Sequence, residues 1–294
     1  MRFDCISVVG LGLLGGSLAL AAKERKLANR VHAYARRAET VAEARARHAA
    51  DLATTNLKEA VQGADLVVLC TPLSQMGELA SQMRLFLRSG AIVTDVGSVK
   101  APVVAELEPL LRSAKVEFVG SHPMAGSERT GLTASRADLF DQAVCLVTPS
   151  AGVSPSAISA VEQFWRDLGA CPLRMSPETH DDLVSRSSHL PHVVAAELAN
   201  YVLSPVHPKE QAMVCGPGFR DTTRIASGSP EMWRDIALAN RKNLARVLGV
   251  FIEDLQEFQF VLERGDAKAI EEFFANAKQR RDQWRSASES RATE

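Results

Sequence analysis

A histidine set among glycines and a proline is the most chemically suggestive feature of this chain. Residues 120–128 read Gly-Ser-His-Pro-Met-Ala-Gly-Ser-Glu and follow a short apolar run at residues 116–119, which predicts a strand. Pro123 pushes His122 towards an extended conformation, and the glycines permit turns and the close approach of a ligand. We therefore expect the imidazole of His122 just past a strand end, at the edge where open α/β sheets bind ligands. The alternative is a solvated loop histidine without a special role.

Three further segments concentrate polar side chains that could do chemistry. Residues 94–100 follow a predicted strand and begin a helix, whereas residues 187–192 and 218–226 lie in the helical second half of the chain. Each segment also has a purely structural explanation. Ser98 could be a helix N-cap, the histidines could be core or interface residues, and Arg224 could form an ion pair with Asp221. Taken singly, these explanations are at least as good as a catalytic role.

A glycine-rich turn near the N-terminus predicts a dinucleotide site. Residues 10–15 read Gly-Leu-Gly-Leu-Leu-Gly, the G-x-G-x-x-G pattern, between a predicted strand and a predicted helix. Gly10 is expected to make the tight turn, Gly12 to let a pyrophosphate approach the backbone, and Gly15 to allow close helix–strand packing. The helix N-terminus then offers free N–H groups to the anion. The cofactor-binding residues of this turn are Gly10, Gly12, Leu13, Leu14 and Gly15.

The end of the second predicted strand indicates which dinucleotide binds. An NAD site usually carries an acidic residue there, but residues 34–37 read Tyr-Ala-Arg-Arg, with Ala35 at the expected acidic position. Arg36 and Arg37 suit bidentate capture of a 2′-phosphate. We therefore predict NADP as the cofactor. NAD remains possible if the two arginines only form a solvated charged turn.

Alternating strand-like and helix-like runs predict an α/β domain with a doubly wound, mostly parallel sheet. Strands are expected at residues 5–9, 31–34, 65–70, 91–95, 116–119, 143–147 and 171–175. After Ser176-Pro177, helical periodicity dominates and predicts an all-α domain. Its long helices are expected at residues 178–203, 232–264 and 267–285. We place a dinucleotide-binding Rossmann domain in residues 1–176 and a helical substrate and dimerisation domain in residues 177–294.

Composition limits the possible partners and compartment. The net charge of -1 gives no reason to expect a nucleic-acid partner. Five scattered cysteines without C-x-x-C spacing resemble small buried hydrophobes of a reducing cytoplasm, and no metal site is expected. The chain has no signal-peptide pattern and no apolar run that could span a bilayer. Apolar positions across residues 244–258 exceed one helix face, which predicts a homodimer.

Together these segments resemble the prephenate/arogenate (cyclohexadienyl) dehydrogenase family. The resemblance runs from the first strand to the end of the helical domain. It rests on residues 120–128, on Ser-His-Leu-Pro-His at residues 188–192 and on Arg-Asp-Thr-Thr-Arg-Ile-Ala at residues 220–226. It implies a Rossmann domain followed by a helical dimerisation domain. It also implies oxidative decarboxylation of prephenate and/or arogenate by hydride transfer to NADP, in tyrosine biosynthesis.

The resemblance also implies roles for individual residues. His122 would be the base at the C4 hydroxyl, Ser98 would orient it or bind the same hydroxyl, and Arg224 would clamp a substrate carboxylate. The other implied substrate-binding residues are Ser188, His189, His192, Glu128 and Trp233. The nicotinamide ribose would pass Thr71 and Pro72, with Asp181 and Asp221 as supports. Glu231 could recognise the amino group of arogenate, although a dipole-stabilised acid in the first turn of a helix explains it better.

Two other functions stay open at this stage. A hydroxyacid dehydrogenase can share the plan of a Rossmann domain followed by a helical domain, but it typically uses a lysine in the helical domain. Residues 187–192 contain no lysine. A dinucleotide-sensing regulator on the same fold would not need His122, Ser98 and Arg224 together.

Overall fold

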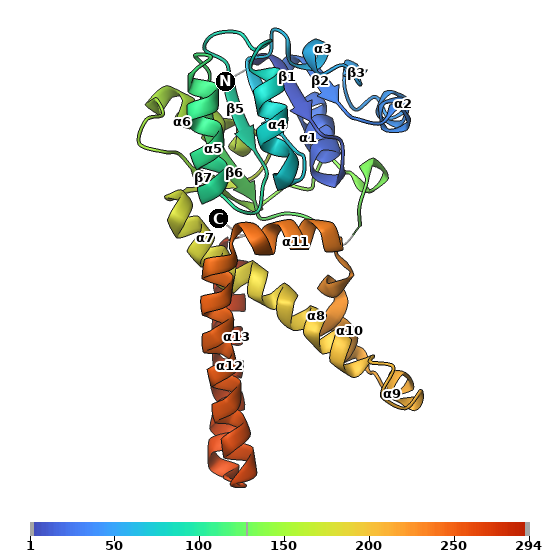
Figure 1. Cartoon of the computed structure of the whole chain (residues 1–294), viewed down its shortest axis with the longest axis vertical. Helices are drawn as coiled ribbons and strands as arrows, with labels where there is room; N and C mark the ends of the chain where they lie inside the picture. Colours follow the sequence, from blue (N-terminus) through green and yellow to red (C-terminus); the bar gives the residue numbers. More distant parts are fainter. Residues whose placement is uncertain (1–2, 128, 292–294) are drawn as a thin grey trace. The chain divides into compact units, whose positions relative to one another are not determined.

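Eight strands form one sheet in the computed structural model, in the order β3-β2-β1-β4-β5-β6-β7-β8 (Figure 1). The structure describes residues 3–127 and 129–291, with side chains up to residue 284. The strands are β1 (Phe3–Val9), β2 (Ala28–Tyr34), β3 (Leu52–Thr54), β4 (Leu66–Leu69), β5 (Ile92–Asp95), β6 (Glu117–Pro123), β7 (Val144–Thr148) and β8 (Cys171–Arg174). Only β6 and β7 pair in antiparallel fashion; the other neighbouring pairs are parallel. The predicted doubly wound, mostly parallel sheet is therefore confirmed, with the short β3 as an unpredicted addition.

Helices cover both faces of this sheet, so its central strands are buried on both sides. Along β1, Ile6 and Val8 belong to one apolar core and Cys5 and Val9 to the other. The first core takes side chains from α1 (Leu13–Glu24), α2 (Ala38–Ala46) and α6 (Pro155–Asp167). The second takes them from α3 (Leu57–Val61), α4 (Leu73–Met83) and α5 (Ala101–Arg112). This two-sided burial explains why the strands read as continuous apolar runs in the sequence.

Strand β6 is longer than predicted, and this changes the position of His122. Residues 117–119 pair with β5, as expected, but Gly120 to Pro123 continue the strand by pairing with β7. His122 therefore lies inside a strand opposite Leu146 and is 7% exposed. The expectation of a loop position just past the strand end is wrong, and so is the solvated alternative. Residues 120–123 have low β-propensity because they include glycine and proline, so their sequence does not predict a strand. They form one because β7 pairs with them.

The second half is helical up to the end of the described chain. The predicted helix over residues 178–203 consists of α7 (Pro177–Val184), a π-helical turn at Ser185–His189 and α8 (Leu190–Val202). The following segments are α9 (Glu210–Met213), α10 (Pro217–Thr223), a 3-10 turn at Arg224–Ser227 and α11 (Pro230–Ala239). The predicted single helix over residues 232–264 is interrupted at Asn240, where α11 ends and α12 (Arg241–Glu263) begins.

A compact unit, Lys242–Glu294, is separate from the unit Met1–Arg241. Within it, α12 and α13 (Ala267–Arg291) pack through aromatic rings, since Phe258 stacks on Phe273 with ring centroids 4.2 Å apart. This unit keeps large apolar side chains at the surface, among them Ile252, Leu255 and Phe274. Of the helices that the structure describes, none is long and apolar enough to cross a membrane.

Candidate active site

The turn between β1 and α1 has the geometry that a pyrophosphate requires. Gly10 has a φ of 106°, and a Cβ there would lie 2.7 Å from the carbonyl oxygen of Cys70. A Cβ on Gly15 would overlap the carbonyl oxygen of Gly10, so close packing of α1 on β1 also needs glycine. By contrast, nothing lies within 4 Å of a Cβ built on Gly12, and no side chain caps the N-terminus of α1. The helix start at Leu13 therefore faces open space with its N–H groups available to an anion.

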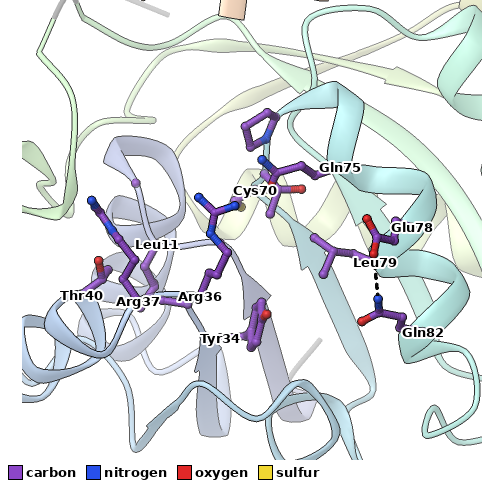
Figure 2. A pocket seen from close by; sticks show the side chains of 15 residues that line it. Leu11, Tyr34, Arg36, Arg37, Thr40, Cys70, Gln75, Glu78, Leu79 and Gln82 are labelled. Carbon is purple, nitrogen blue, oxygen red and sulfur yellow. Dashed lines mark hydrogen bonds between the residues drawn. The ribbon is translucent and has the colours of Figure 1, made fainter. Parts of the chain in front are cut away.

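A cavity of about 550 Å³ extends from this turn to the end of β2 (Figure 2). Arg36 and Arg37 leave the strand end together and line the cavity, with Thr40 beside Arg37. Both arginines are exposed, and neither forms an ion pair with any residue that the structure describes. Ala35 is buried at the position where an NAD site usually has its acid.

Thr71 and Pro72 line the same cavity from the end of β4. The hydroxyl oxygen of Thr71 is buried and has no hydrogen-bond partner within the described part of the chain. Because buried polar groups normally find a partner, this hydroxyl fits a ligand atom. The glycine turn, the two arginines and Thr71 together suit a dinucleotide.

Further along the sheet edge, His122 is held by a short series of buried side chains. Its Nδ1 lies 2.9 Å from Nε2 of His180, and Nδ1 of His180 lies 2.8 Å from a carboxylate oxygen of Asp181. Asp181 also accepts the backbone N–H groups of Lys100 and Ala101, at 2.7 and 2.9 Å. The three side chains therefore form a fixed series that ends at the start of α5.

These contacts determine where the protons lie. A carboxylate only accepts, so Nδ1 of His180 donates to Asp181 and Nε2 of His180 accepts. Nδ1 of His122 must then donate to His180, which leaves Nε2 of His122 with a bare lone pair. Burial lowers the pKa of His122 well below its ordinary value, and the nearby ammonium group of Lys100 adds to this shift. Burial also lowers the pKa of His180. Both rings are neutral at pH 7, and His122 can act as a base.

A buried ion pair lies beside this series. The ammonium group of Lys100 contacts the carboxylate of Asp95 and donates to the carbonyl oxygen of Ser121 at 2.8 Å; both charged side chains are 0% exposed. Asp95 also accepts the N–H groups of Gly97 and Ser121, at 2.8 and 3.1 Å. A pair this deep persists only where hydrogen bonds satisfy both charges. The pair ties the end of β5 to β6, directly before His122.

Sequence reasoning missed three of these residues: Asp95, Lys100 and His180. Residues 94–100 stand out as polar, but a lysine is rarely fully buried and nothing local marks this one as an exception. His180 is one of five consecutive polar residues, 178–182, in the first turns of a helix, and only tertiary packing brings it to His122. Asp181, expected as a support, does lie in the series.

Two predicted histidines gather around Trp233. Its ring stacks on that of His192 with centroids 3.8 Å apart and meets the ring of His189 edge-on at 6.2 Å. Nδ1 of His192 donates to the carbonyl oxygen of Ser188 at 2.9 Å. Burial lowers the pKa of His192, and the nearby charge of Arg224 lowers it further. Arg224 lines a second cavity of about 490 Å³ at the ends of α8 and α10.

The structure shows no hydrogen bond from the remaining predicted residues that it describes to His122. Ser98 is half-buried between β5 and α5, and the N-cap of α5 is Lys100, so Ser98 is not a helix cap. No hydrogen bond joins Ser98 to His122, whose Nδ1 is taken by His180. Asp221 and Glu231 are exposed, and Glu231 lies in the first turn of α11. Glu128 lies outside the described residues.

A glycine turn after the first strand of a doubly wound sheet, with a buried neutral imidazole on the same sheet, is the arrangement of a dinucleotide-dependent dehydrogenase. The family model for the prephenate dehydrogenase nucleotide-binding domain matches residues 18–172, and the model for the prephenate dehydrogenase dimerization domain matches residues 176–276. The chain belongs to the prephenate dehydrogenase family. It is an oxidoreductase whose cofactor is a nicotinamide dinucleotide.

Individual relatives cover nearly the whole chain. A cyclohexadienyl dehydrogenase from Zymomonas mobilis is 35% identical over 282 residues, which is 95% of each chain. A prephenate dehydrogenase from Bacillus subtilis is 34% identical over 95% of this chain and 76% of its own length. The structure also resembles prephenate dehydrogenase from Aquifex aeolicus in complex with hydroxyphenyl propionate and NAD+, with a TM-score of 0.90, 30% identity and coverage of 96% and 99%. The interpretation as a prephenate/arogenate dehydrogenase is therefore favoured over a hydroxyacid dehydrogenase or a dinucleotide-sensing regulator.

Proposed function

We propose that this enzyme oxidatively decarboxylates prephenate, arogenate or both, in the synthesis of tyrosine, with NADP preferred over NAD. One observation carries the proposal: Nε2 of His122 is unprotonated and free to accept a proton. The hydrogen bonds from His122 to His180 and from His180 to Asp181 keep the His122 ring neutral and fix its orientation. The names of the relatives support the substrate class, since they act on prephenate or on cyclohexadienyl compounds. The products are 4-hydroxyphenylpyruvate from prephenate and tyrosine from arogenate.

The substrate dictates what the protein must supply. Prephenate carries a hydroxyl at C4 and, at C1, a carboxylate and a pyruvyl side chain on a cyclohexadiene ring. When bound, the nicotinamide accepts the hydride from C4, and loss of CO2 from C1 makes the ring aromatic. The protein must provide a base for the hydroxyl proton, cationic or donor groups for carboxylates, and a site poor in water.

His122 meets the first requirement. Its Nε2 takes the hydroxyl proton, and the positive charge that develops on the ring is shared with His180 through the Nδ1–H bond. The carboxylate of Asp181 stabilises that charge and holds both rings in orientation, as an aspartate does in other histidine-based sites. Ser98, half-buried after β5, is proposed to bind the same hydroxyl.

The residues around Trp233 are proposed to bind the rest of the substrate. His189, His192 and Ser188 would surround the ring, and Arg224 would take a carboxylate. In the described structure, this arrangement is supported by the stacking of His192 on Trp233 and by the proximity of Arg224 to His192. Glu128 is proposed, on the family resemblance alone, to help close the site over the substrate. The exposed Glu231 acts as a first-turn helix acid, and we assign it no part in substrate choice.

Replacing Arg224 with alanine is expected to raise the substrate KM roughly 10- to 100-fold, because a charge-assisted bond to a carboxylate is lost. The turnover number at saturating substrate should fall much less, since His122 is untouched. Initial rates across a range of prephenate concentrations test this. Arg220→Ala, which removes the preceding arginine from the same cavity, is the matched control. An unchanged KM for Arg224→Ala would remove this residue from substrate binding.

Different residues are proposed to bind different parts of the dinucleotide. The turn at Gly10, Gly12 and Gly15, with the helix start at Leu13 and Leu14, would hold the pyrophosphate. Thr71 and Pro72 would lie at the nicotinamide ribose. Arg36 and Arg37 would hold the 2′-phosphate that distinguishes NADP.

Changing both Arg36 and Arg37 to alanine is expected to lower kcat/KM for NADP roughly 10- to 100-fold, because charge-assisted contacts to the 2′-phosphate are lost. The kcat/KM for NAD should change little, so the preference for NADP over NAD becomes smaller or reverses. Arg30→Ala, at the other end of β2 and paired with Asp4, serves as the control. Equal losses with the two cofactors would contradict a phosphate-binding role.

We propose a domain boundary at residue 176, with the dinucleotide-binding domain in residues 1–176 and the substrate and dimerisation domain in residues 177–294. The gap between the two family matches at residues 172 and 176 supports this position. The dimerization-domain match also supports a homodimer.

The five cysteines are all free, which supports a reducing, cytoplasmic location.

Turnover with defined pairs of reactants tests the proposal. Prephenate and arogenate are each supplied with NAD and with NADP, absorbance at 340 nm is followed, and the aromatic product and CO2 are quantified. Equal amounts of reduced cofactor, CO2 and a 4-hydroxyphenyl product are expected, fastest with NADP. Absence of turnover with all four pairs would overturn the proposed function.

A further inference from the structure

Asn240, which no sequence pattern singled out, directs its side chain into the active-site region. It ends α11 and is 4% exposed. Its side-chain nitrogen Nδ2 lies 2.8 Å from the carbonyl oxygen of Asp181 and 3.2 Å from Nδ1 of His189. One amide group therefore contacts both the backbone of the residue that anchors His180 and a second active-site imidazole.

The carbonyl of Asp181 fixes the orientation of this amide. A carbonyl oxygen only accepts, so the group of Asn240 that faces it must be the NH2 and not the amide oxygen. The second hydrogen of that NH2 faces Nδ1 of His189, which must therefore be an unprotonated acceptor. Burial lowers the pKa of His189 to about 4, so the ring is neutral at pH 7. Its single proton then belongs on Nε2.

Nε2 of His189 is a buried donor without a well-formed hydrogen bond in the described part of the chain. The His189 ring is 0% exposed, and Nε2 has no hydrogen-bond partner within the described part of the chain. The backbone of Ser98 raises the pKa of His189 as a hydrogen bond to the ring would, but no acceptor in the described part of the chain meets hydrogen-bond geometry with Nε2. An unpaired buried N–H is costly, and such a group fits an acceptor that arrives with a ligand.

We propose that Asn240 is a positioning residue that fixes His189 as the Nε2–H tautomer, so that His189 donates a hydrogen bond to an oxygen atom of the bound reactants. The site then holds two neutral imidazoles with opposite roles: His122 accepts a proton, and His189 donates a hydrogen bond. The identity of the reactants rests on the proposed function, whereas the tautomer is a property of the free enzyme.

The tautomer can be read directly by ¹⁵N–¹H correlation spectra of the full-length enzyme labelled at its seven histidines. The signal of His189 is assigned by its disappearance in a His189→Gln variant. At pH 7 and without ligands, the proton is expected on Nε2 of His189. A proton on Nδ1 in the wild-type enzyme would overturn the inference. This measurement does not depend on turnover, so it stands even if prephenate and arogenate are not the substrates.

An Asn240→Asp variant reverses the polarity of the contact. The carboxylate cannot donate, so Nδ1 of His189 is expected to gain a proton and Nε2 to lose its own. The hydrogen bond from Nε2 to the reactant oxygen is then lost, and kcat/KM is expected to fall roughly 10- to 100-fold. Asn200→Asp adds the same charge at an exposed position of α8 and should leave both readouts unchanged. An Asn240→Asp enzyme with an unchanged His189 signal and unchanged kinetics would contradict the proposal.

Binding of NADP alone, measured by fluorescence titration, tells which reactant supplies the acceptor. A weaker Kd in Asn240→Asp places the acceptor on the cofactor; an unchanged Kd with a reduced kcat/KM for the organic substrate places it on that substrate. Either result supports the donor role. If the variant does not fold, the wild-type spectrum alone still decides the tautomer.

Discussion

Replacing His122 with asparagine is expected to lower kcat about 10²- to 10⁴-fold, the loss typical of removing a positioned base. Asparagine can keep a hydrogen bond towards His180, but its amide has no lone pair basic enough to take the hydroxyl proton. The buried position makes this loss hard to compensate, because His122 is 7% exposed and water has little access. Initial rates at saturating NADP and prephenate measure the effect.

The same variant should bind NADP almost normally. The glycine turn and the two arginines belong to β1, α1 and the end of β2, whereas His122 lies on β6 and makes no hydrogen bond to them. Fluorescence titration with NADP provides this control. Full activity in His122→Asn would show that another group takes the proton, and a simultaneous loss of NADP binding would indicate a misfolded site.

Replacing Lys100 with methionine is expected to destabilise the fold by about 3–5 kcal/mol, the loss found when one partner of a buried ion pair is removed. The carboxylate of Asp95 would then be fully buried with only the N–H groups of Gly97 and Ser121 as partners. Methionine fills most of the lysine's volume, so the effect comes from the lost charge and not from a cavity. Urea unfolding at a fixed protein concentration measures it.

A double-mutant cycle separates this pair from general damage. Adding Asp95→Asn to Lys100→Met removes the stranded charge and should recover part of the lost stability. Lys268→Met, which breaks an exposed pair with Glu272, should have little effect. A Lys100→Met enzyme as stable as the wild type would contradict the view that this pair holds the end of β5 to β6.

Sequence patterns predicted the parts of the site that local chemistry determines. The succession of strands and helices along the first half of the chain, apart from the short β3, and the glycine turn at Gly10 follow from periodicity and from residue types with few alternatives. The family motifs pointed to His122, His189 and His192, which the structure brings into one region of the fold. These signals are local, so they can be read from one segment at a time.

The groups that tune those histidines depend on tertiary structure and were not predictable. His180 reaches His122 only because α7 packs against α5 and β7, and 58 residues separate the two histidines in sequence. Asn240 reaches His189 across 51 residues, from a position where helical periodicity continues without interruption. The strand position of His122 was missed because β7, not the local sequence, extends β6.

In the proposed reaction, Nε2 of His122 accepts the proton of the substrate hydroxyl. A crystal structure of this enzyme with NADP and 4-hydroxyphenylpropionate, a ring compound that keeps the hydroxyl, tests it most directly. We expect the hydroxyl within hydrogen-bond distance, about 2.6–3.2 Å, of Nε2 of His122, with the ligand carboxylate at Arg224. A ligand bound with its hydroxyl away from His122, and with His122 touching only protein atoms, would contradict the account.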